Sequence, residues 1–202
     1  MKLSELKEEY KKRKKEIQRR LKEFSRKRHS SRGDLFLELC YCLCTPLSKA
    51  EKVYERINKD SEDLLSKAGQ AKVASFLRGT CRFHRNKSKY IVDSRAFIQC
   101  MKLPSDPMEA REYLVRNVKG LGYKEASHFL RNIGYRGLAI LDGHIIHSLH
   151  QLKVLKTDER PKSRKEYLAM EEKMKKFANK VGIDLDELDL LFWSMRTGKV
   201  LK

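Results

Sequence analysis

The chain has 202 residues, and its 46 Lys and Arg side chains outnumber its 27 Asp and Glu side chains, which leaves a net charge of +19. Solubility needs far less charge, so this excess favours a polyanionic partner such as a nucleic acid. The alternative, a heat-adapted surface, explains the 36% charged residues but not the imbalance of sign. We find no apolar stretch long enough to span a membrane and no apolar export signal, so we expect a cytoplasmic protein whose five Cys are reduced.

The first segment, residues 1–32, carries about half of the excess charge, with fourteen Lys and Arg against five Glu. Its apolar residues recur at gaps of three, four and seven, which predicts an amphipathic helix with a basic outer face. They are Leu3, Leu6, Tyr10, Ile17, Leu21 and Phe24. Whether the basic face contacts a partner or is only solvated stays open.

Residues 34–44 are almost continuously apolar and contain Cys40, Cys42 and Cys44. Periodicity does not decide between a buried helix and a buried strand here. The chain has no Cys-x-x-Cys pair, so we interpret these cysteines as small buried hydrophobes rather than ligands of a metal or an iron–sulfur cluster.

The remainder is predicted as a series of helices. Ser48 and Glu51 have the spacing of a capping box, and Gly182 is a typical helix stop. The expected helices cover residues 48–58, 61–67, 70–77, 86–101, 107–117, 123–132 and 144–151, and two more begin after Ser163 and Asp184. No segment has the alternating pattern of hairpin strands, so the predicted fold class is all-α.

A glycine hairpin, Gly120-Leu121-Gly122, joins the helical stretches of residues 112–132. The glycines let the backbone approach a phosphate closely, and the amides at the start of the second helix would point at that phosphate. Gly120 and Gly122 are therefore candidate DNA-binding residues, although a plain helix–helix turn has the same pattern.

Lys124 and Asp142 are the candidate catalytic residues. Lys124 follows the hairpin in the first turn of a helix, where the helix dipole disfavours an ammonium, so a partly buried lysine there could act as an amine nucleophile. Asp142 follows an apolar pair and precedes a helical stretch. Alone, Lys124 would be interpreted as a phosphate contact and Asp142 as a helix N-cap. Together, separated by one helix and one loop, they indicate a candidate catalytic pair.

Three histidines, His144, His147 and His150, recur every third residue beside Asp142. His144 and His147 share a helix face and could bind a metal, but His150 is rotated away from them. We expect solvated or core-edge histidines rather than a metal site.

Two motifs resemble a known superfamily. Residues 118–127, VKGLGYKEAS, resemble the hairpin of the helix-hairpin-helix DNA glycosylases, and residues 141–147, LDGHIIH, resemble their Asp-containing loop. Lys124 stands at the position that distinguishes the bifunctional glycosylase/AP lyases. With LCYCLCTPLSKA, RFHRNKSKYIV and the C-terminal FWSMRTGKVLK, almost the whole chain resembles the type-2 8-oxoguanine DNA glycosylase/AP lyases of archaea and some thermophilic bacteria.

This resemblance implies a two-lobed helical helix-hairpin-helix DNA glycosylase fold with an inter-lobe cleft, in which residues 1–202 form a single catalytic domain. The helix-hairpin-helix would span about residues 112–132 and the Asp loop residues 140–144, with the basic helix of residues 1–32 at the N-terminus. Iron–sulfur members of the superfamily carry four cysteines near the C-terminus, and no Cys follows residue 100 here. No metal or other cofactor is therefore expected.

The resemblance also implies a mechanism. The damaged guanine would be flipped out of the duplex, and Lys124 would attack C1′, displace 8-oxoguanine and leave a Schiff base. Asp142 would assist deprotonation of Lys124 and stabilise positive charge on the sugar. β-Elimination would then nick the strand 3′ to the lesion.

Further site residues are hypotheses. The C-terminal lysine of type-2 enzymes is implicated in telling 8-oxoguanine from guanine, and here it is Lys202. Trp193, the single tryptophan, is expected to stack on the flipped base or close its pocket, although it could be an ordinary core residue. Phe83 between Arg82 and Arg85 suits base stacking and phosphate contacts, although Phe83 could also be core.

The expected partner is double-stranded DNA containing 8-oxoguanine, bound by a monomer that is associated with the nucleoid in the cytoplasm of a prokaryote, with no membrane. Three alternatives stay open: a non-catalytic helix-hairpin-helix module, a basic RNA-binding or ribosome-associated protein, and a glycosylase for another damaged base. The residue that fills the gap left by the flipped base is not identified, and the Thr45–Ser48 turn and the Arg82–Arg85 loop are the candidates.

Overall fold

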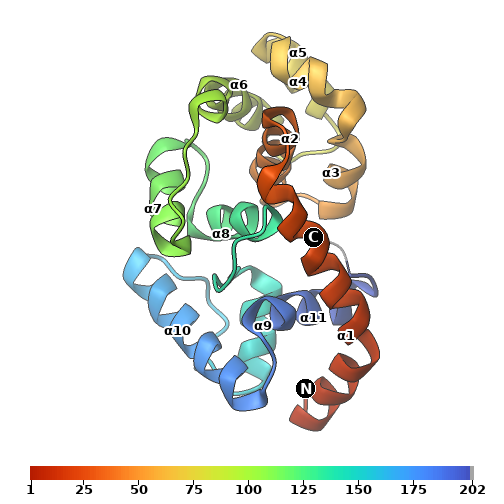
Figure 1. Cartoon of the computed structure of the whole chain (residues 1–202), viewed down its shortest axis with the longest axis vertical. Helices are drawn as coiled ribbons and strands as arrows, with labels where there is room; N and C mark the ends of the chain where they lie inside the picture. Colours follow the sequence, from red (N-terminus) through yellow and green to blue (C-terminus); the bar gives the residue numbers. More distant parts are fainter. Residues whose placement is uncertain (201–202) are drawn as a thin grey trace. The chain divides into compact units, whose positions relative to one another are not determined.

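The computed structural model describes residues 1–200, and within that range every regular element is a helix (Figure 1). The all-α prediction is confirmed. The chain divides into two compact units: unit 1 comprises Met1–Arg26 and Gly134–Lys202, and unit 2 comprises Lys27–Ile133. No helix in the described part of the chain is both long and apolar enough to cross a membrane.

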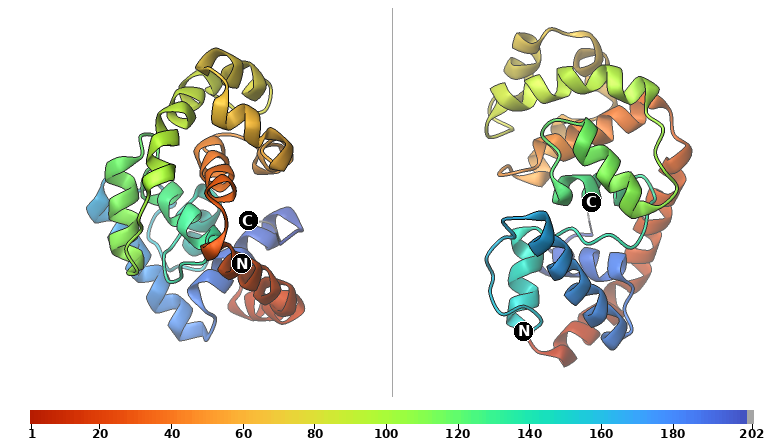
Figure 2. Two further views of the ribbon diagram at one scale, coloured as in Figure 1. Left: turned by 45° about the horizontal axis from the view of Figure 1, so that its top comes forward. Right: turned by 90° about the vertical axis from the view of Figure 1, so that its left-hand side faces the viewer.

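Unit 2 is built around α2 (Arg32–Cys44), which contacts four other helices of the unit (Figures 1 and 2). The elements of this unit are η1 (Lys27–His29), α2, α3 (Ala50–Arg56), η2 (Lys59–Ser61), α4 (Glu62–Lys67), α5 (Gln70–Leu77), α6 (His84–Cys100), α7 (Pro107–Asn117) and α8 (Tyr123–Asn132). α2 begins where the Ser31 hydroxyl accepts a hydrogen bond from Asp34 N at 3.1 Å. Every residue from Leu35 to Cys44 is buried, so the apolar run is a central helix and not a strand.

The cysteines of α2 are buried free thiols, as the interpretation of residues 34–44 predicted. Burial raises the pKa of the Cys40 thiol. Cys81 is also buried, whereas Cys100 is exposed at the end of α6. Cys40, Cys42 and Cys44 therefore act as small packing residues of the core.

The capping box predicted for Ser48 and Glu51 is wrong. α3 begins at Ala50, and its N-cap residue, Lys49, makes no side-chain capping bond. The Ser48 hydroxyl instead accepts hydrogen bonds from the backbone N–H of Arg82 at 3.1 Å and from the Lys87 ammonium at 3.0 Å. A partner distant in sequence has replaced the local one that the spacing indicated.

Lys87 of α6 is only 5% exposed, and its ammonium lies at the C-terminal end of α2. Besides the Ser48 hydroxyl, it donates to the carbonyl oxygens of Cys44 at 2.7 Å and Pro46 at 2.6 Å. The last carbonyls of a helix lack hydrogen-bond donors within the helix and attract cations. The Lys87 ammonium supplies that donor at the C-terminal end of α2. Burial lowers the pKa of Lys87, because the interior disfavours the charged form.

Unit 1 packs α1 (Leu3–Arg26) against α11 (Leu185–Thr197), which also contacts α9 (Gly143–Gln151) and α10 (Arg164–Val181) (Figure 2). Within the predicted stripe of α1, Leu6, Ile17, Leu21 and Phe24 are buried. Two polar contacts add to this packing, since Tyr10 OH donates to Glu187 Oε2 and Gln18 Nε2 donates to Glu187 Oε1 at 2.9 Å. The amphipathic character predicted for this helix is confirmed.

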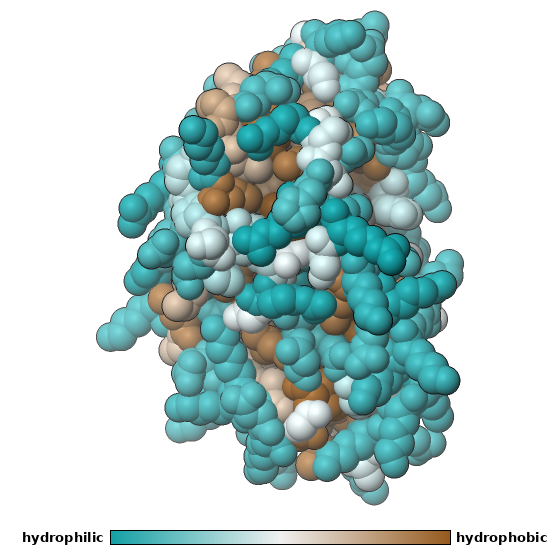
Figure 3. All heavy atoms as spheres, viewed as in Figure 1, coloured by the Kyte–Doolittle hydropathy of each residue, from teal (hydrophilic) through white to brown (hydrophobic). Residues whose placement is uncertain are grey.

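The helix expected over residues 1–32 is shorter than predicted, because α1 ends at Arg26 and the division between the units follows it. Lys27–His29 form a separate 3₁₀ turn, and Ser31 starts α2. The predicted basic segment thus contributes to both units. Hydrophilic side chains cover most of the face of the molecule in Figure 3.

The local signals in the last third of the chain are confirmed. Ser163 accepts from Glu166 N at 3.2 Å at the start of α10, and Gly182 ends that helix with a φ of +70°. Asp184 caps α11.

The start of α6, in unit 2, differs from the prediction. This helix begins at His84, two residues before the predicted start.

We predict that Lys87→Met lowers the free energy of unfolding by about 3 kcal/mol, because three oxygens at the end of α2 lose their donor. Urea denaturation monitored by circular dichroism measures this change. The matched control is Lys89→Met, which removes an exposed ammonium from the same helix and should change stability by less than about 0.5 kcal/mol. Equal losses in the two variants would contradict the role of Lys87.

Candidate active site

The hairpin between α7 and α8 has a backbone that requires glycine at one position. Gly120 has a φ of +92°, which L side chains rarely adopt, and a Cβ there would collide with the ring of Tyr90 from α6. Leu121 is buried between the two glycines, and its N–H donates to Val118 O at 3.2 Å. Tyr90 and Leu121 therefore fix the shape of the turn, and Gly122 is the N-cap residue of α8.

Side-chain contacts hold the first turn of α8 against α7. Tyr123 OH donates to Glu112 Oε1 at 2.6 Å, and the guanidinium of Arg111 lies over the Tyr123 ring, 5.2 Å from its centroid. Arg111 is buried and also donates to the Ser127 hydroxyl at 3.2 Å. Tyr123 directly precedes Lys124, so these contacts fix the backbone from which the candidate nucleophile projects.

Lys124 keeps 22% of its side-chain surface exposed, and its ammonium lies 3.7 Å from Glu125 Oε1. The charges of Lys124 and Glu125 both act on buried Lys87, the former lowering and the latter raising the pKa of Lys87. The two lysines differ in their bonding, since Lys87 donates to three protein oxygens while the contact of Lys124 is an ion pair with its neighbour. Of these two lysines, only Lys124 has a partly exposed side chain.

Asp142 is the N-cap residue of α9. Its Oδ1 accepts hydrogen bonds from His144 N at 2.8 Å and Ile145 N at 2.9 Å, which fixes the side-chain rotamer. Among residues 1–200, Oδ2 accepts no hydrogen bond from any other side chain or amide, and the residue is half-buried. A single carboxylate can therefore act as the helix cap and still present one oxygen for proton transfer.

The segment that leads to Asp142 is held by two neighbouring helices. Glu171 Oε1 of α10 accepts from Ala139 N at 2.8 Å, and Asp186 Oδ2 of α11 accepts from Gly137 N at 3.0 Å. Tyr167 OH donates to Ala139 O at 2.7 Å. These buried polar side chains satisfy main-chain groups that have no helix or sheet partner, so the Asp loop has a defined position within unit 1.

Trp193 of α11 lies beside the start of α9. The ring of His144 meets the indole edge to face, with centroids 5.7 Å apart. The Trp193 Nε1–H is buried and has no acceptor among the described residues. The Arg160 guanidinium lies next to Gly143. Within unit 1, the two residues that follow Asp142 therefore have a cation and an indole beside them: Arg160 at Gly143 and Trp193 at His144.

Phe83 and Leu47 are exposed large apolar residues in strained backbone conformations. Phe83 is 53% exposed with a φ of +59°, and Leu47 is 58% exposed with a φ of +55°. Positive φ in a residue other than glycine is unfavourable and occurs mainly where the surrounding structure imposes it. The Arg82 N–H to Ser48 hydroxyl bond links their two turns directly.

The predicted site residues thus divide between the units. Lys124, Gly120, Gly122, Phe83, Arg82 and Arg85 belong to unit 2, and Asp142 and Trp193 belong to unit 1. Arg82 and Arg85 are exposed, and the Arg82 guanidinium lies 5.3 Å from the centroid of the Phe83 ring. Phe83 is therefore not the core residue that its alternative interpretation would require. Lys202 lies outside the described residues.

Sequence reasoning missed Lys87, Glu125, Tyr167 and Arg160, whereas it included Leu47 only as part of the Thr45–Ser48 turn. Glu125 could have been proposed because it directly follows Lys124 in the sequence. Arg160 is well separated in the sequence from the Asp loop, and only the structure places it beside Gly143. Lys87 and Tyr167 carry no local signal, because their partners are more than twenty residues away in the chain. Leu47 follows Pro46 in a turn, which indicates exposure but not its backbone conformation.

The three histidines beside Asp142 do not converge. His144 faces Trp193, whereas the His147 ring lies 3.5 Å from Asp158 Oδ2 and 3.1 Å from Gln151 Nε2. Within residues 1–200, no group of three or more His, Cys, Asp or Glu side chains is arranged to hold a metal ion.

Comparison with known proteins gives the family. The model of the family described as 8-oxoguanine DNA glycosylase matches residues 17–183. The 8-oxoguanine DNA glycosylase/AP lyase of Methanocaldococcus jannaschii is 40% identical over 192 residues, covering 92% of this chain and 91% of the relative. The protein of the same name from Fusobacterium nucleatum is 39% identical over 216 residues, with coverages of 98% and 97%.

A solved structure extends the likeness to the fold. The crystal structure of the Methanocaldococcus jannaschii 8-oxoguanine glycosylase/lyase in complex with 15mer DNA containing 8-oxoguanine matches with a TM-score of 0.89 at 37% identity, covering 99% of each chain. A helix-hairpin-helix followed by an Asp-containing loop defines the class as a helix-hairpin-helix DNA glycosylase. The chain belongs to the 8-oxoguanine DNA glycosylase family, which confirms the resemblance seen in the sequence.

We predict that Gly120→Ala lowers the free energy of unfolding by about 2 kcal/mol and weakens duplex binding about tenfold, because a side chain at positive φ also displaces Tyr90. Thermal melting and fluorescence anisotropy measure the two effects. Gly122→Ala is the matched control for the stability measurement, since its φ of −89° suits alanine and its Cβ meets only the end of the Glu125 side chain. If both variants behave alike, the strained turn is not what shapes the hairpin.

Proposed function

We propose that the protein is a bifunctional DNA repair enzyme that excises 8-oxoguanine from duplex DNA and then cleaves the strand at the resulting abasic site. The observation that carries this proposal is the amine of Lys124, partly exposed in the first turn of α8, directly after a glycine hairpin, in a chain of this family. The names of the relatives and the DNA complex of one of them support the substrate and both activities.

The first step makes Lys124 the nucleophile. Its neutral amine attacks C1′ of the damaged nucleotide, the C1′–N9 bond breaks with its electron pair moving to the base, and a proton completes the released 8-oxoguanine. Asp142 accepts the proton that Lys124 loses and stabilises the positive charge that develops on the sugar. The unoccupied Oδ2 supports this role, because the cap uses Oδ1 only.

The second step is β-elimination. Opening of the sugar ring converts the amine adduct to a Schiff base between Lys124 and C1′, which acidifies the hydrogens at C2′. Removal of one of these protons expels the 3′ phosphate and nicks the strand, and water then releases Lys124. Lysine supplies the electrophilic iminium for this chemistry, so the proposed mechanism uses no metal or redox cofactor.

The affinity for DNA would come mainly from contacts between the protein and the phosphate groups of the DNA backbone. The hairpin at Gly120 and Gly122 lets the amides at the start of α8 approach a phosphate, and the exposed Arg82 and Arg85 add cations. The net charge of +19 provides the long-range, salt-dependent part of binding. We propose that a monomer binds double-stranded DNA in this way, on the nucleoid of a prokaryotic cell.

Leu47 and Phe83 are the proposed wedges that hold the duplex open around the flipped nucleotide. Leucine and phenylalanine side chains inserted between base steps unstack them, and these two side chains are exposed at linked turns. Their positive φ values support a functional reason for the strain.

Residues of unit 1 would recognise the flipped 8-oxoguanine base. The buried Nε1–H of Trp193, which has no acceptor among the described residues, supports a position at the base pocket, where the indole stacks on the base or closes over it. From the family resemblance, Lys202 is proposed to help distinguish 8-oxoguanine from guanine.

We predict that Lys124→Gln abolishes the covalent complex that borohydride traps with 8-oxoguanine duplex, while binding of a duplex with an abasic-site analogue is retained. Denaturing gel electrophoresis and fluorescence anisotropy measure the two outcomes. Lys119→Gln is the matched control, because it removes an exposed charge from the same hairpin and should weaken binding while trapping continues. A non-catalytic DNA-binding module would give no trapped complex even with the wild-type chain.

We predict that Phe83→Ala and Leu47→Ala slow excision from duplex DNA about tenfold but have little effect on a lesion in single-stranded DNA, since a wedge is needed only to open the duplex. Single-turnover kinetics on the two substrates measure the ratio. Met108→Ala, which truncates another exposed apolar side chain of unit 2, should leave both rates unchanged. Equal slowing on both substrates would argue against a wedge.

A further inference from the structure

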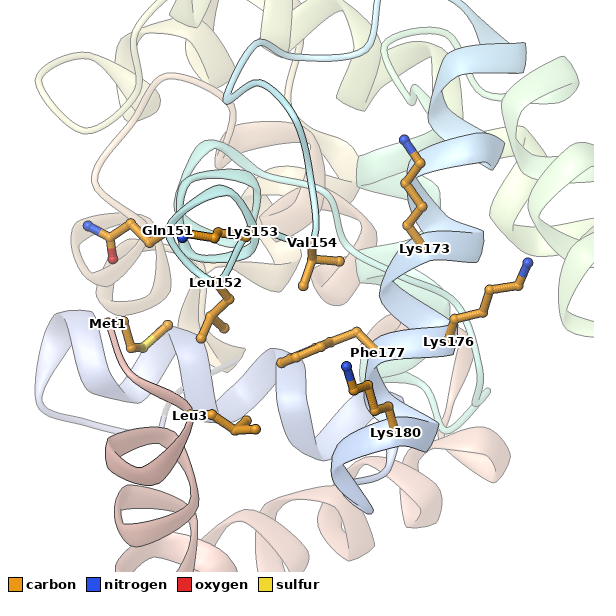
Figure 4. A pocket seen from close by; sticks show the side chains of 10 residues that line it. All are labelled: Met1, Leu3, Gln151, Leu152, Lys153, Val154, Lys173, Lys176, Phe177 and Lys180. Atoms are coloured by element: carbon orange, nitrogen blue, oxygen red, sulfur yellow. The ribbon is translucent and has the colours of Figure 1, made fainter.

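A cavity of about 470 Å³ lies in unit 1 between the start of α1, the turn after α9 and the last turns of α10 (Figure 4). It is at the opposite end of α9 from Asp142, and the nine residues of that helix correspond to about 13 Å. The proposed function assigns nothing to it.

The floor of this cavity is apolar. Leu3, Leu152, Val154 and Phe177 point into a common space in Figure 4, and all four are partly exposed to solvent. The Phe177 ring reaches across from α10 toward Leu152 (Figure 4). The last carbonyls of α9 do not face the space unpaired, because Lys153 N donates to His150 O and Val154 N donates to Leu149 O, each at 2.9 Å. One or two large apolar side chains fit such a floor.

The rim of the cavity is cationic. Lys173, Lys176 and Lys180 project from consecutive turns of α10, and Lys153 projects from the turn after α9 (Figure 4). No carboxylate is among the described residues that line the cavity, and only Lys176 of these four makes an ion pair, with Glu172 at 3.6 Å. Lys153 also has a φ of +59°, a conformation that favours glycine and costs a lysine about 1 kcal/mol. The rim therefore attracts an anion.

We propose that this cavity is a docking site for an acidic peptide segment of a partner protein, which inserts one or two large apolar side chains onto the floor while its carboxylates meet the lysines. Charge complementarity selects the acidic peptide, and the partly exposed floor requires an apolar anchor. A duplex backbone offers phosphates for the rim but no apolar group for Leu152 and Phe177, so it leaves the floor unfilled. The site would connect the enzyme to a partner through a surface that the reaction does not use.

The test uses the full chain and two fluorescein-labelled hexapeptides of equal charge, Asp-Glu-Asp-Glu-Phe-Leu and Asp-Glu-Asp-Glu-Ser-Ser. Fluorescence anisotropy should show the first peptide binding at least about tenfold more tightly, because only it has an anchor for the floor. Phe177→Ala should remove that advantage. Lys180→Glu should weaken the first peptide about tenfold, whereas the matched control Lys165→Glu, exposed on the same helix but outside the cavity, should not.

Each contrary result overturns the proposal. Equal affinity of the two peptides, or equal losses for Lys180→Glu and Lys165→Glu, would mean that the peptide follows general surface charge. Binding that survives Phe177→Ala but is displaced by a short undamaged duplex would assign the peptide to the DNA surface. Laurate that binds more tightly than the peptide and depends on Phe177 would assign the cavity to a lipid. Excision activity of Phe177→Ala and Lys180→Glu should equal that of wild type, which reports folding independently of the peptide.

Discussion

The buried ammonium of Lys87 is the interaction on which the site in unit 2 depends most. It joins the end of α2 to the turn that presents Leu47, because its acceptors are Cys44 O, Pro46 O and the Ser48 hydroxyl. The Ser48 hydroxyl in turn holds the backbone beside Phe83 through Arg82 N. A charge in the interior is tolerated only when its donors are used, and here the donors fix two turns at once. The charge of Lys124 lowers the pKa of Lys87, so the buried lysine and the proposed nucleophile lie in one neighbourhood.

In unit 1, two carboxylates and a tyrosine bond to the main chain of the segment that leads to Asp142. Asp142 caps a helix that follows an irregular segment, and irregular segments leave main-chain groups without partners in a helix or sheet. Glu171, Asp186 and Tyr167 supply those partners from α10 and α11. In both units, buried polar side chains hold main-chain atoms beside a residue that we propose to be catalytic or to contact DNA. Residues outside the recognised motifs therefore determine how accurately the motifs are held.

Local signals in the sequence were sufficient for much of this structure. Ser163, Asp184 and Gly182 mark helix ends through bonds to their own neighbours, and the hairpin glycines are recognisable because the turn needs a positive φ at Gly120. The family resemblance added the roles that we propose for Lys124 and Asp142, which spacing alone left open between catalysis and ordinary capping or phosphate contact.

Features that depend on distant partners could not be predicted. Ser48 has the spacing of a capping residue, but its hydroxyl bonds to Lys87, thirty-nine residues away. The helix expected over residues 1–32 ends at Arg26 because Ser31 begins a new helix in another unit, and amphipathic periodicity does not report such a boundary. Likewise, the apolar run of residues 34–44 is a helix in which every residue from Leu35 to Cys44 is buried. A fully buried helix and a fully buried strand have the same continuous apolar pattern, so the sequence did not distinguish them.

The central claim is that Lys124, and no other amine, forms the covalent bond to the sugar. Its test is to reduce the intermediate with borohydride on an 8-oxoguanine duplex, digest the complex with protease and nuclease, and locate the sugar adduct by tandem mass spectrometry. Our account predicts the adduct on Lys124 alone. An adduct on Lys87, the buried lysine whose pKa the charge of Lys124 lowers, or on Lys119 of the same hairpin would contradict it.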